Sequence, residues 1–144
     1  TLGSIGTTQI IKKSQNIHIY TVNGIKVDVV NYPYPWIKPT ITENAIRLGS
    51  KPDIAAMKLA AVAGRGSKKD FIDIYFLLKE FSLSELLAFY NQKYSDGSSF
   101  MVLKSLTYFN DADDDPNPIM LIPTSWEQVK TIIAKEVEAF FSPS

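Results

Sequence analysis

Four helix starts between residues 50 and 127 constrain the fold of this chain more than any other feature. Each is a serine or threonine followed three residues later by an acid: Ser50 and Asp53, Ser67 and Asp70, Ser82 and Glu85, and Thr124 and Glu127. The hydroxyl accepts a backbone hydrogen bond and the acid bonds back to the cap, which satisfies free amides at a helix N-terminus. The sequence therefore predicts helices over about 52–64, 68–80, 83–95 and 125–141, with another at 98–107.

The first part of the chain carries a β-strand pattern instead. Residues 9–13, 16–22 and 25–30 are runs rich in strand-forming residues, and Asn23-Gly24 separates the last two. Both residues of this pair tolerate the positive φ of a tight hairpin turn. The following Tyr32-Pro-Tyr-Pro-Trp36 is an extended aromatic connector, because a residue before proline avoids the helical conformation. We therefore expect an α+β fold in one compact unit, with a β-hairpin or sheet at 1–40 and a helical bundle at 41–144.

Composition excludes several classes of site and partner. The 144 residues contain no cysteine and a single histidine, His18, which excludes a disulfide scaffold, a thiolate metal site and a multi-histidine zinc site. Fifteen basic residues balance fifteen acidic ones, so a wholly cationic nucleic-acid binder is excluded and a local basic patch is not. No apolar run approaches the roughly 20 residues of a membrane helix. No signal peptide opens the sequence, so we expect a cytoplasmic protein.

Two charged residues lie inside predicted helices that are otherwise apolar. Lys58 is the one charge in the middle of the first helix, and Asp73 interrupts the apolar run of the second. A desolvated ammonium needs a carboxylate, a cleft or an anionic ligand, unless its methylenes let it reach the surface. Asp70 shares a helix face with Asp73, although the capping box alone explains Asp70. The pattern predicts that Asp73 pairs with Lys58 or Arg65.

Three further segments suggest anion or cation sites. The turn Gly64-Arg65-Gly66-Ser67-Lys68-Lys69 suits phosphate through its free amides, and is equally typical of an exposed basic turn. Asp28 lies on a strand with apolar alternate positions, so it either holds a divalent metal or faces water. In the acidic loop at 111–118, Asp111, Asp113 and Asp115 have the spacing of the first three ligands of a calcium-binding loop. Pro116 and Ile122, however, stand where such a loop needs Gly and Glu.

Residues 53–78, Asp-Ile-Ala-Ala-Met-Lys-Leu-Ala-Ala-Val-Ala-Gly-Arg-Gly-Ser-Lys-Lys-Asp-Phe-Ile-Asp-Ile-Tyr-Phe-Leu-Leu, resemble the nucleotidyltransferase AbiEii/AbiGii toxin family. In that family a helix with Lys precedes an Arg and then Asp-x-x-Asp, an aromatic residue and leucines. Supporting matches are Val-Asp-Val-Val around Asp28, the aromatic connector, and Asp-Ala-Asp-Asp-Asp-Pro-x-Pro before a final helix that begins with Trp. The resemblance runs from about Ile10 to the C-terminus.

The resemblance implies a nucleotidyltransferase-like α/β core with a helical C-terminal half, and transfer of a nucleotide from an NTP with magnesium. Several family members are toxins of type IV toxin–antitoxin or abortive-infection systems, and some act on tRNA. By this resemblance Lys58 contacts the nucleotide phosphates and Arg65 helps to hold phosphate or nucleic acid. Either Asp70 or Asp73 is the acid of the last motif, acting as a base or orienting Lys58. Asp28 is a further carboxylate beside the metal. The implied partners are NTP, an RNA or protein acceptor and a cognate antitoxin.

The first motif of the family is missing from this sequence. That motif is Gly-Gly or Gly-Ser followed by a metal-binding Asp-x-Asp, whereas here Gly3-Ser4 precedes no such pair and the first acid is Asp28. We therefore expect a C-terminal fragment that is inactive alone and binds Mg²⁺ and NTP weakly or not at all. Two alternatives remain: a non-catalytic module that docks an antitoxin or RNA through residues 64–69 and the connector, and a relic in which Lys58 and Asp73 form only a buried ion pair.

Overall fold

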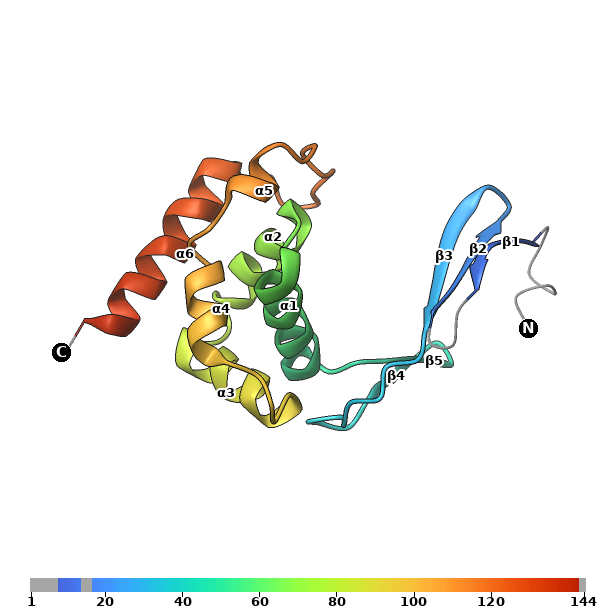
Figure 1. The fold of residues 1–144 in the computed structure, drawn as a ribbon, viewed down its shortest axis with the longest axis horizontal. Coiled ribbons are helices and arrows are strands. Elements are labelled where there is room, and N and C mark those ends of the chain that lie inside the picture. Colours follow the sequence, from blue (N-terminus) through green and yellow to red (C-terminus); the bar gives the residue numbers. More distant parts are fainter. Residues whose placement is uncertain (1–7, 14–16, 143–144) are drawn as a thin grey trace. The chain divides into compact units, whose positions relative to one another are not determined.

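The computed structural model describes residues 8–13 and 17–142, which form an α+β chain of small antiparallel sheets and helices (Figure 1). The α+β class is thus confirmed. Contacts within the chain divide it into two units, with the division between Tyr34 and Pro35 inside the aromatic connector. The sequence pattern had placed the change from strands to helices near residue 40. Residues from Pro35 onward belong to the second unit, where the Pro35 carbonyl accepts from Lys93 and the amides of residues 37 and 38 donate to Asp53.

The first unit contains a three-stranded antiparallel sheet in the order β1-β2-β3, formed by β1 (Thr8–Lys13), β2 (Ile17–Val22) and β3 (Ile25–Val30). The predicted hairpin is confirmed, since Asn23 and Gly24 have φ of 50° and 79° and join β2 to β3. Positive φ at both turn residues matches the right-handed twist of the strands. In this register Val22 pairs with Ile25 and Tyr20 with Val27.

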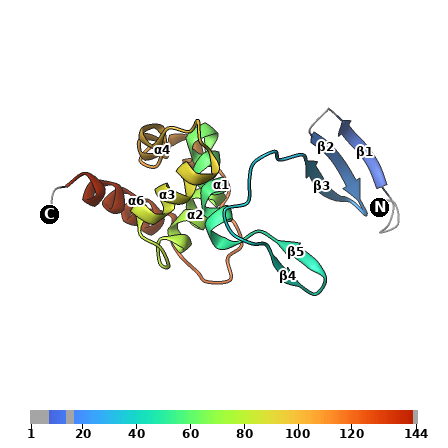
Figure 2. The same cartoon turned by 90° about the horizontal axis from the view of Figure 1, so that it is seen from below.

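A second, unpredicted hairpin opens the helical unit. β4 (Ile41–Glu43) and β5 (Ile46–Leu48) pair antiparallel around Asn44 and Ala45, whose φ values are 51° and 64°. Strands of three residues are too short to show an alternating pattern, and alanine is an unusual choice for the left-handed conformation. The hairpin therefore left no clear signal in the sequence. It leads directly into the first helix (Figure 2).

The helices are α1 (Lys51–Arg65), α2 (Lys68–Leu77), α3 (Leu83–Lys93), α4 (Ser99–Ser105), α5 (Asn110–Asp113) and α6 (Trp126–Phe141). Ser50, Ser67 and Ser82 cap α1, α2 and α3 as predicted. The cap of α6 is Ser125 rather than Thr124, because the Ser125 hydroxyl accepts from the Gln128 amide at 3.1 Å. The short α5 lies where the sequence predicted an acidic loop.

The core of the second unit lies among these helices. α1 contacts α2, α3 and α4, while α6 packs against α2 and α3 (Figure 1). Apolar residues at helical spacing supply the fully buried side chains, which include Leu59, Phe71, Leu86, Val102 and Ile133. Among the described residues, none of the helices combines the length and apolar character that crossing a membrane requires. This packing sets α1 beside α2, which places the charged residues of both helices together.

Candidate functional site

Lys58 lies between two carboxylates of the neighbouring helix. Its Nζ is 3.0 Å from Oδ1 of Asp70 and 2.8 Å from Oδ2 of Asp73. Lys58 projects from the middle of α1, and the two acids lie on one face of α2 because they are three residues apart. The predicted ion pair between Lys58 and Asp73 is therefore confirmed, and Asp70 joins it.

The three side chains differ in exposure and in the number of partners. Asp70 is 18% exposed, and its Oδ2 also accepts from the amide of Ser67 at 3.1 Å and from the hydroxyl at 2.9 Å. Asp70 thus belongs to the capping box of α2 and to the lysine site at once. Asp73 is 48% exposed and Lys58 29% exposed. The relic alternative required a buried pair, and the structure does not show one because Asp73 faces solvent.

The electrostatics keep Lys58 and Asp70 charged at neutral pH. Partial burial acts to lower the pKa of Lys58, but hydrogen bonds and charge from Asp73 and Asp70 outweigh it and raise that pKa. Burial likewise acts to raise the pKa of Asp70, and hydrogen bonds from Lys58 and Ser67 outweigh it and lower that pKa. A carboxylate with a lowered pKa is a poor proton acceptor. Asp70 therefore suits orienting Lys58 better than acting as a base.

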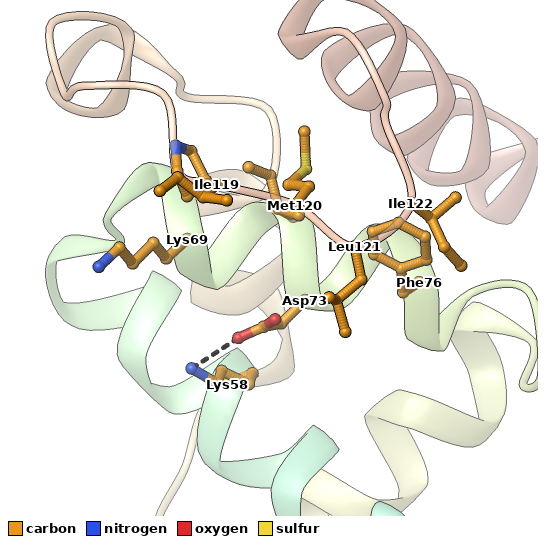
Figure 3. Close-up of a pocket in the computed structure, with 10 residues that line it drawn as sticks. Lys58, Lys69, Asp73, Phe76, Ile119, Met120, Leu121 and Ile122 are labelled. Carbon is orange, nitrogen blue, oxygen red and sulfur yellow. Dashed lines mark ion pairs between the residues drawn. The ribbon is translucent and has the colours of Figure 1, made fainter.

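Lys58 and Asp73 open into a surface cavity of about 690 Å³ (Figure 3). Lys69 joins them at its charged end. The other walls are apolar and come from α2 and from the segment that precedes α6: Ile72, Phe76, Pro118, Ile119, Met120, Leu121 and Ile122. A second hollow of about 290 Å³ shares Asp73 and Phe76 with it. The volume of the first cavity lies in the usual range of small-molecule sites.

The basic turn between α1 and α2 is less available to phosphate than its sequence suggests. The Ser67 amide donates to Asp70, and the Lys68 amide donates to Oδ2 of Asp115 at 2.9 Å. Carboxylates of the protein thus occupy the helix N-terminus where an anion would bind. Arg65 is exposed in the last turn of α1 and makes no ion pair in the part of the chain that the structure describes.

Lys68 binds the acidic loop, a contact that the sequence did not indicate. Its side chain is only 4% exposed, and its Nζ donates to the carbonyls of Asp113 at 3.3 Å and Asp115 at 2.6 Å, and to Oδ1 of Asn117 at 3.2 Å. The ring of Trp126 covers it at 5.2 Å. The acidic loop thus wraps an ammonium group with oxygen ligands. This contact joins residues 47 positions apart, so no local pattern reveals it.

Asp28 lies in the first unit, on β3, and is half-exposed. Its Oδ2 is 3.6 Å from Nζ of Lys26, two residues earlier on the same strand. Within residues 8–13 and 17–142 no group of three or more His, Cys, Asp or Glu side chains could hold a metal ion. Asp70 and Asp73 are bound to Lys58 instead. These residues therefore do not fit a magnesium ion, which needs oxygen ligands in near-octahedral geometry.

A fully buried ion pair, missed from the sequence, lies elsewhere on α1. Nζ of Lys93 is 2.9 Å from Oδ1 of Asp53, with the two side chains 1% and 0% exposed. Lys93 also donates to the carbonyl of Pro35 at 2.9 Å and lies 5.0 Å from the ring centroid of Trp36. The amides of residues 37 and 38 donate to Asp53. The pair thus ties the end of the aromatic connector to α1 and α3, which gives it a structural role.

Comparison with known proteins adds one relative. No family model matches the sequence, and no solved structure matches it. The chain is similar to the uncharacterized protein aq_aa25 of Aquifex aeolicus (strain VF5), with 33% identity over 132 residues. The match covers 89% of this chain and 63% of the relative, so the chain spans less than two thirds of that protein's length. The relative's name carries no activity, and the function is therefore argued from the site.

Proposed function

We propose that the chain is part of an NTP-dependent nucleotidyltransferase of the AbiEii toxin kind, which transfers a nucleotide to RNA or protein. In this proposal the described helices supply the phosphate-binding lysine, and the metal-binding carboxylates come from outside the 144 residues. The observation that carries the proposal is the placement of Lys58, which is charged and oriented by two acids at the edge of a cavity.

A free donor on Lys58 supports phosphate as its ligand. An ammonium group has three N–H donors. Two of them point to Asp70 and Asp73, and the third finds no acceptor among the residues that the structure describes. A phosphate oxygen in the cavity would complete the set. Lys69, at the same end of the cavity, adds a second positive charge. Transfer of a nucleotidyl group depends mainly on positioning and on neutralising phosphate charge. In this proposal Lys58, held by its two acids, supplies positioning, and Lys69 supplies the positive charge that no acid of the cavity offsets.

Asp70 and Asp73 have different roles in this proposal. Asp70 is held by the capping box, so it fixes the direction of the Lys58 ammonium. Asp73 is half-exposed and lines the cavity, so it is the acid that an incoming acceptor group meets. Because the present residues do not fit magnesium, no step is assigned to a metal here.

Binding of nucleotide to the 144-residue chain is the direct test of the lysine site. We expect each NTP to bind this chain weakly without added metal, and Lys58→Met to raise the Kd about tenfold through loss of one charged hydrogen bond. Lys104→Met is the matched control, since Lys104 is an exposed lysine in the last turn of α4 and lies outside the cavity. Titration calorimetry measures both. Equal affinity of wild type and Lys58→Met would contradict the assignment of Lys58.

Activity is tested on the protein encoded by the complete reading frame. The protein is incubated with each NTP radiolabelled at the α-phosphate, magnesium and total cellular RNA, and labelled products are separated by electrophoresis. We expect label on RNA or on protein, lost in Lys58→Met and retained in Lys104→Met. Absence of label on every acceptor would overturn the proposed reaction.

A further inference from the structure

The cavity beside Lys58 has an apolar wall that faces solvent. Residues 119–122, Ile-Met-Leu-Ile, form an irregular segment between Pro118 and Pro123. Ile119 and Leu121 are fully exposed, both at 103%, while Met120 between them packs against the core. Successive side chains of an extended chain point to opposite sides, which explains this alternation. Figure 3 shows Leu121 among the residues that line the cavity together with Phe76 and Asp73.

The wall is anchored at its N-terminal side. Lys68 binds the carbonyls of Asp113 and Asp115 and the side chain of Asn117, the residue before Pro118. Lys68 begins α2, the helix that also carries Asp73 and Phe76. A proline at each end further restricts the backbone of the segment. The apolar wall is therefore positioned by the same helix as the charged end of the cavity.

We propose that this wall is the subsite for the nucleobase of a nucleoside triphosphate whose phosphates bind Lys58 and Lys69. The inference rests on the proposed function and extends it from phosphate binding to recognition of the base. The charged end holds Lys58 and Lys69 together with Asp73, and Asp70 and Asp73 already pair with Lys58, so Lys69 is the lysine there whose charge they do not offset. Two ammonium groups at this end and aliphatic side chains with Phe76 at the other match a ligand with an anionic tail and a flat apolar body. The cavity of about 690 Å³ is large enough for a nucleotide.

The chemistry of the wall also predicts weak selectivity between bases. The side chains of Phe76, Leu121 and Ile122 have no hydrogen-bond donor or acceptor, so they cannot distinguish the polar edges of the four bases. Apolar contact with a base face is tolerant of sequence because every base presents one. We therefore expect the four NTPs to bind with Kd values within about threefold of each other.

Leu121→Ala tests the subsite without disturbing the core. Its side chain is fully exposed, so shortening it removes apolar wall and no internal packing. We expect the Kd for NTP to rise about three- to tenfold, and the Kd for inorganic tripolyphosphate to stay unchanged. Phe100→Ala is the matched control, because Phe100 is an exposed apolar residue, at 68%, that does not line the cavity. Both ligands are titrated into the 144-residue chain by calorimetry.

The two ligands separate failure of this subsite from failure of the proposed function. If tripolyphosphate binds through Lys58 and NTP binds no better in wild type than in Leu121→Ala, the base subsite is overturned and the phosphate site stands. If neither ligand binds, both proposals are overturned. If NTP binds more tightly than tripolyphosphate in wild type and in Phe100→Ala, and Leu121→Ala abolishes this difference in affinity, the wall is the base subsite.

Discussion

The two lysine–carboxylate sites that include α1 residues should lose very different amounts of stability when the lysine is removed. Lys93→Met removes the cation from a pair whose side chains are 1% and 0% exposed. Lys58→Met removes it from a site in which Asp73 is 48% exposed. Methionine keeps most of the aliphatic volume in both variants, so the comparison isolates the charge. We expect Lys93 to stabilise the fold and Lys58 to matter mainly for ligand binding.

The expected cost of Lys93→Met follows from what remains buried. Asp53 would keep hydrogen bonds from Ser50 and from the amides of residues 37 and 38, but would lose its only cation in the described part of the chain. The Pro35 carbonyl would lose its donor as well. Removing one partner of a buried ion pair leaves the other charge buried and unpaired, which lowers stability by about 3–5 kcal/mol. We therefore expect the free energy of unfolding to fall by that amount.

The cost of Lys58→Met should be much smaller. Asp70 would retain its hydrogen bonds from Ser67, and Asp73 would be solvated because half of its side chain is already exposed. Pairs of this exposure contribute about 0–1 kcal/mol. The relic hypothesis, by contrast, needs a cost of about 3–5 kcal/mol for this pair.

Urea unfolding followed by helical circular dichroism measures both costs. With a slope of about 1–3 kcal/mol per molar urea, the Lys93→Met midpoint should lie about 1–2 M below that of Lys58→Met. Unchanged slopes verify that both variants unfold from the same compact state. Equal losses of stability would refute the distinction, and would make Lys58 a structural residue rather than a ligand-binding one.

Three other outcomes follow from the structure. Burial acts to raise the pKa of Asp53, but its hydrogen bonds lower it from 3.8 to about 2. This lowered pKa contributes about 2 kcal/mol to stability above pH 3.8, and this contribution is lost as pH falls toward 2, so urea midpoints measured down this range should fall. Lys68→Met should speed amide hydrogen exchange in residues 111–118 and leave α3 unchanged, whereas equal protection in that loop would contradict the role of the ammonium. Gly64→Ala should raise stability by up to about 1 kcal/mol because a Cβ meets open space in a helix. Gly66→Ala should lower it by about 1–3 kcal/mol because its Cβ would lie 3.0 Å from the backbone of α1, and thermal melts that rank the two variants otherwise would refute this.

Local patterns predicted most of the elements correctly. Ser50, Ser67 and Ser82 cap their helices, and Asn23-Gly24 forms the turn between β2 and β3, because each signal acts through residues within four positions. The predicted ends of α2 and α3 ran two or three residues too far, since apolar residues continue beyond the last helical turn and pack there. The nucleotidyltransferase-like core, the toxin relationship and the roles of Arg65 and Asp28 stay predictions.

The sequence by itself predicted that Lys58 needs a carboxylate, a cleft or an anionic ligand unless it reaches the surface, because an isolated charge in an apolar helix is unfavourable. It also predicted that Asp73 pairs with Lys58 or Arg65. Only the tertiary structure decided that Asp70 shares the ammonium and that Asp73 stays half-exposed. It also decided that Lys93 binds Asp53 and that Lys68 binds the acidic loop. These contacts span 40 and 47 positions. Helix packing brings such residues together through shape and burial, which leave no periodic or local pattern in the sequence.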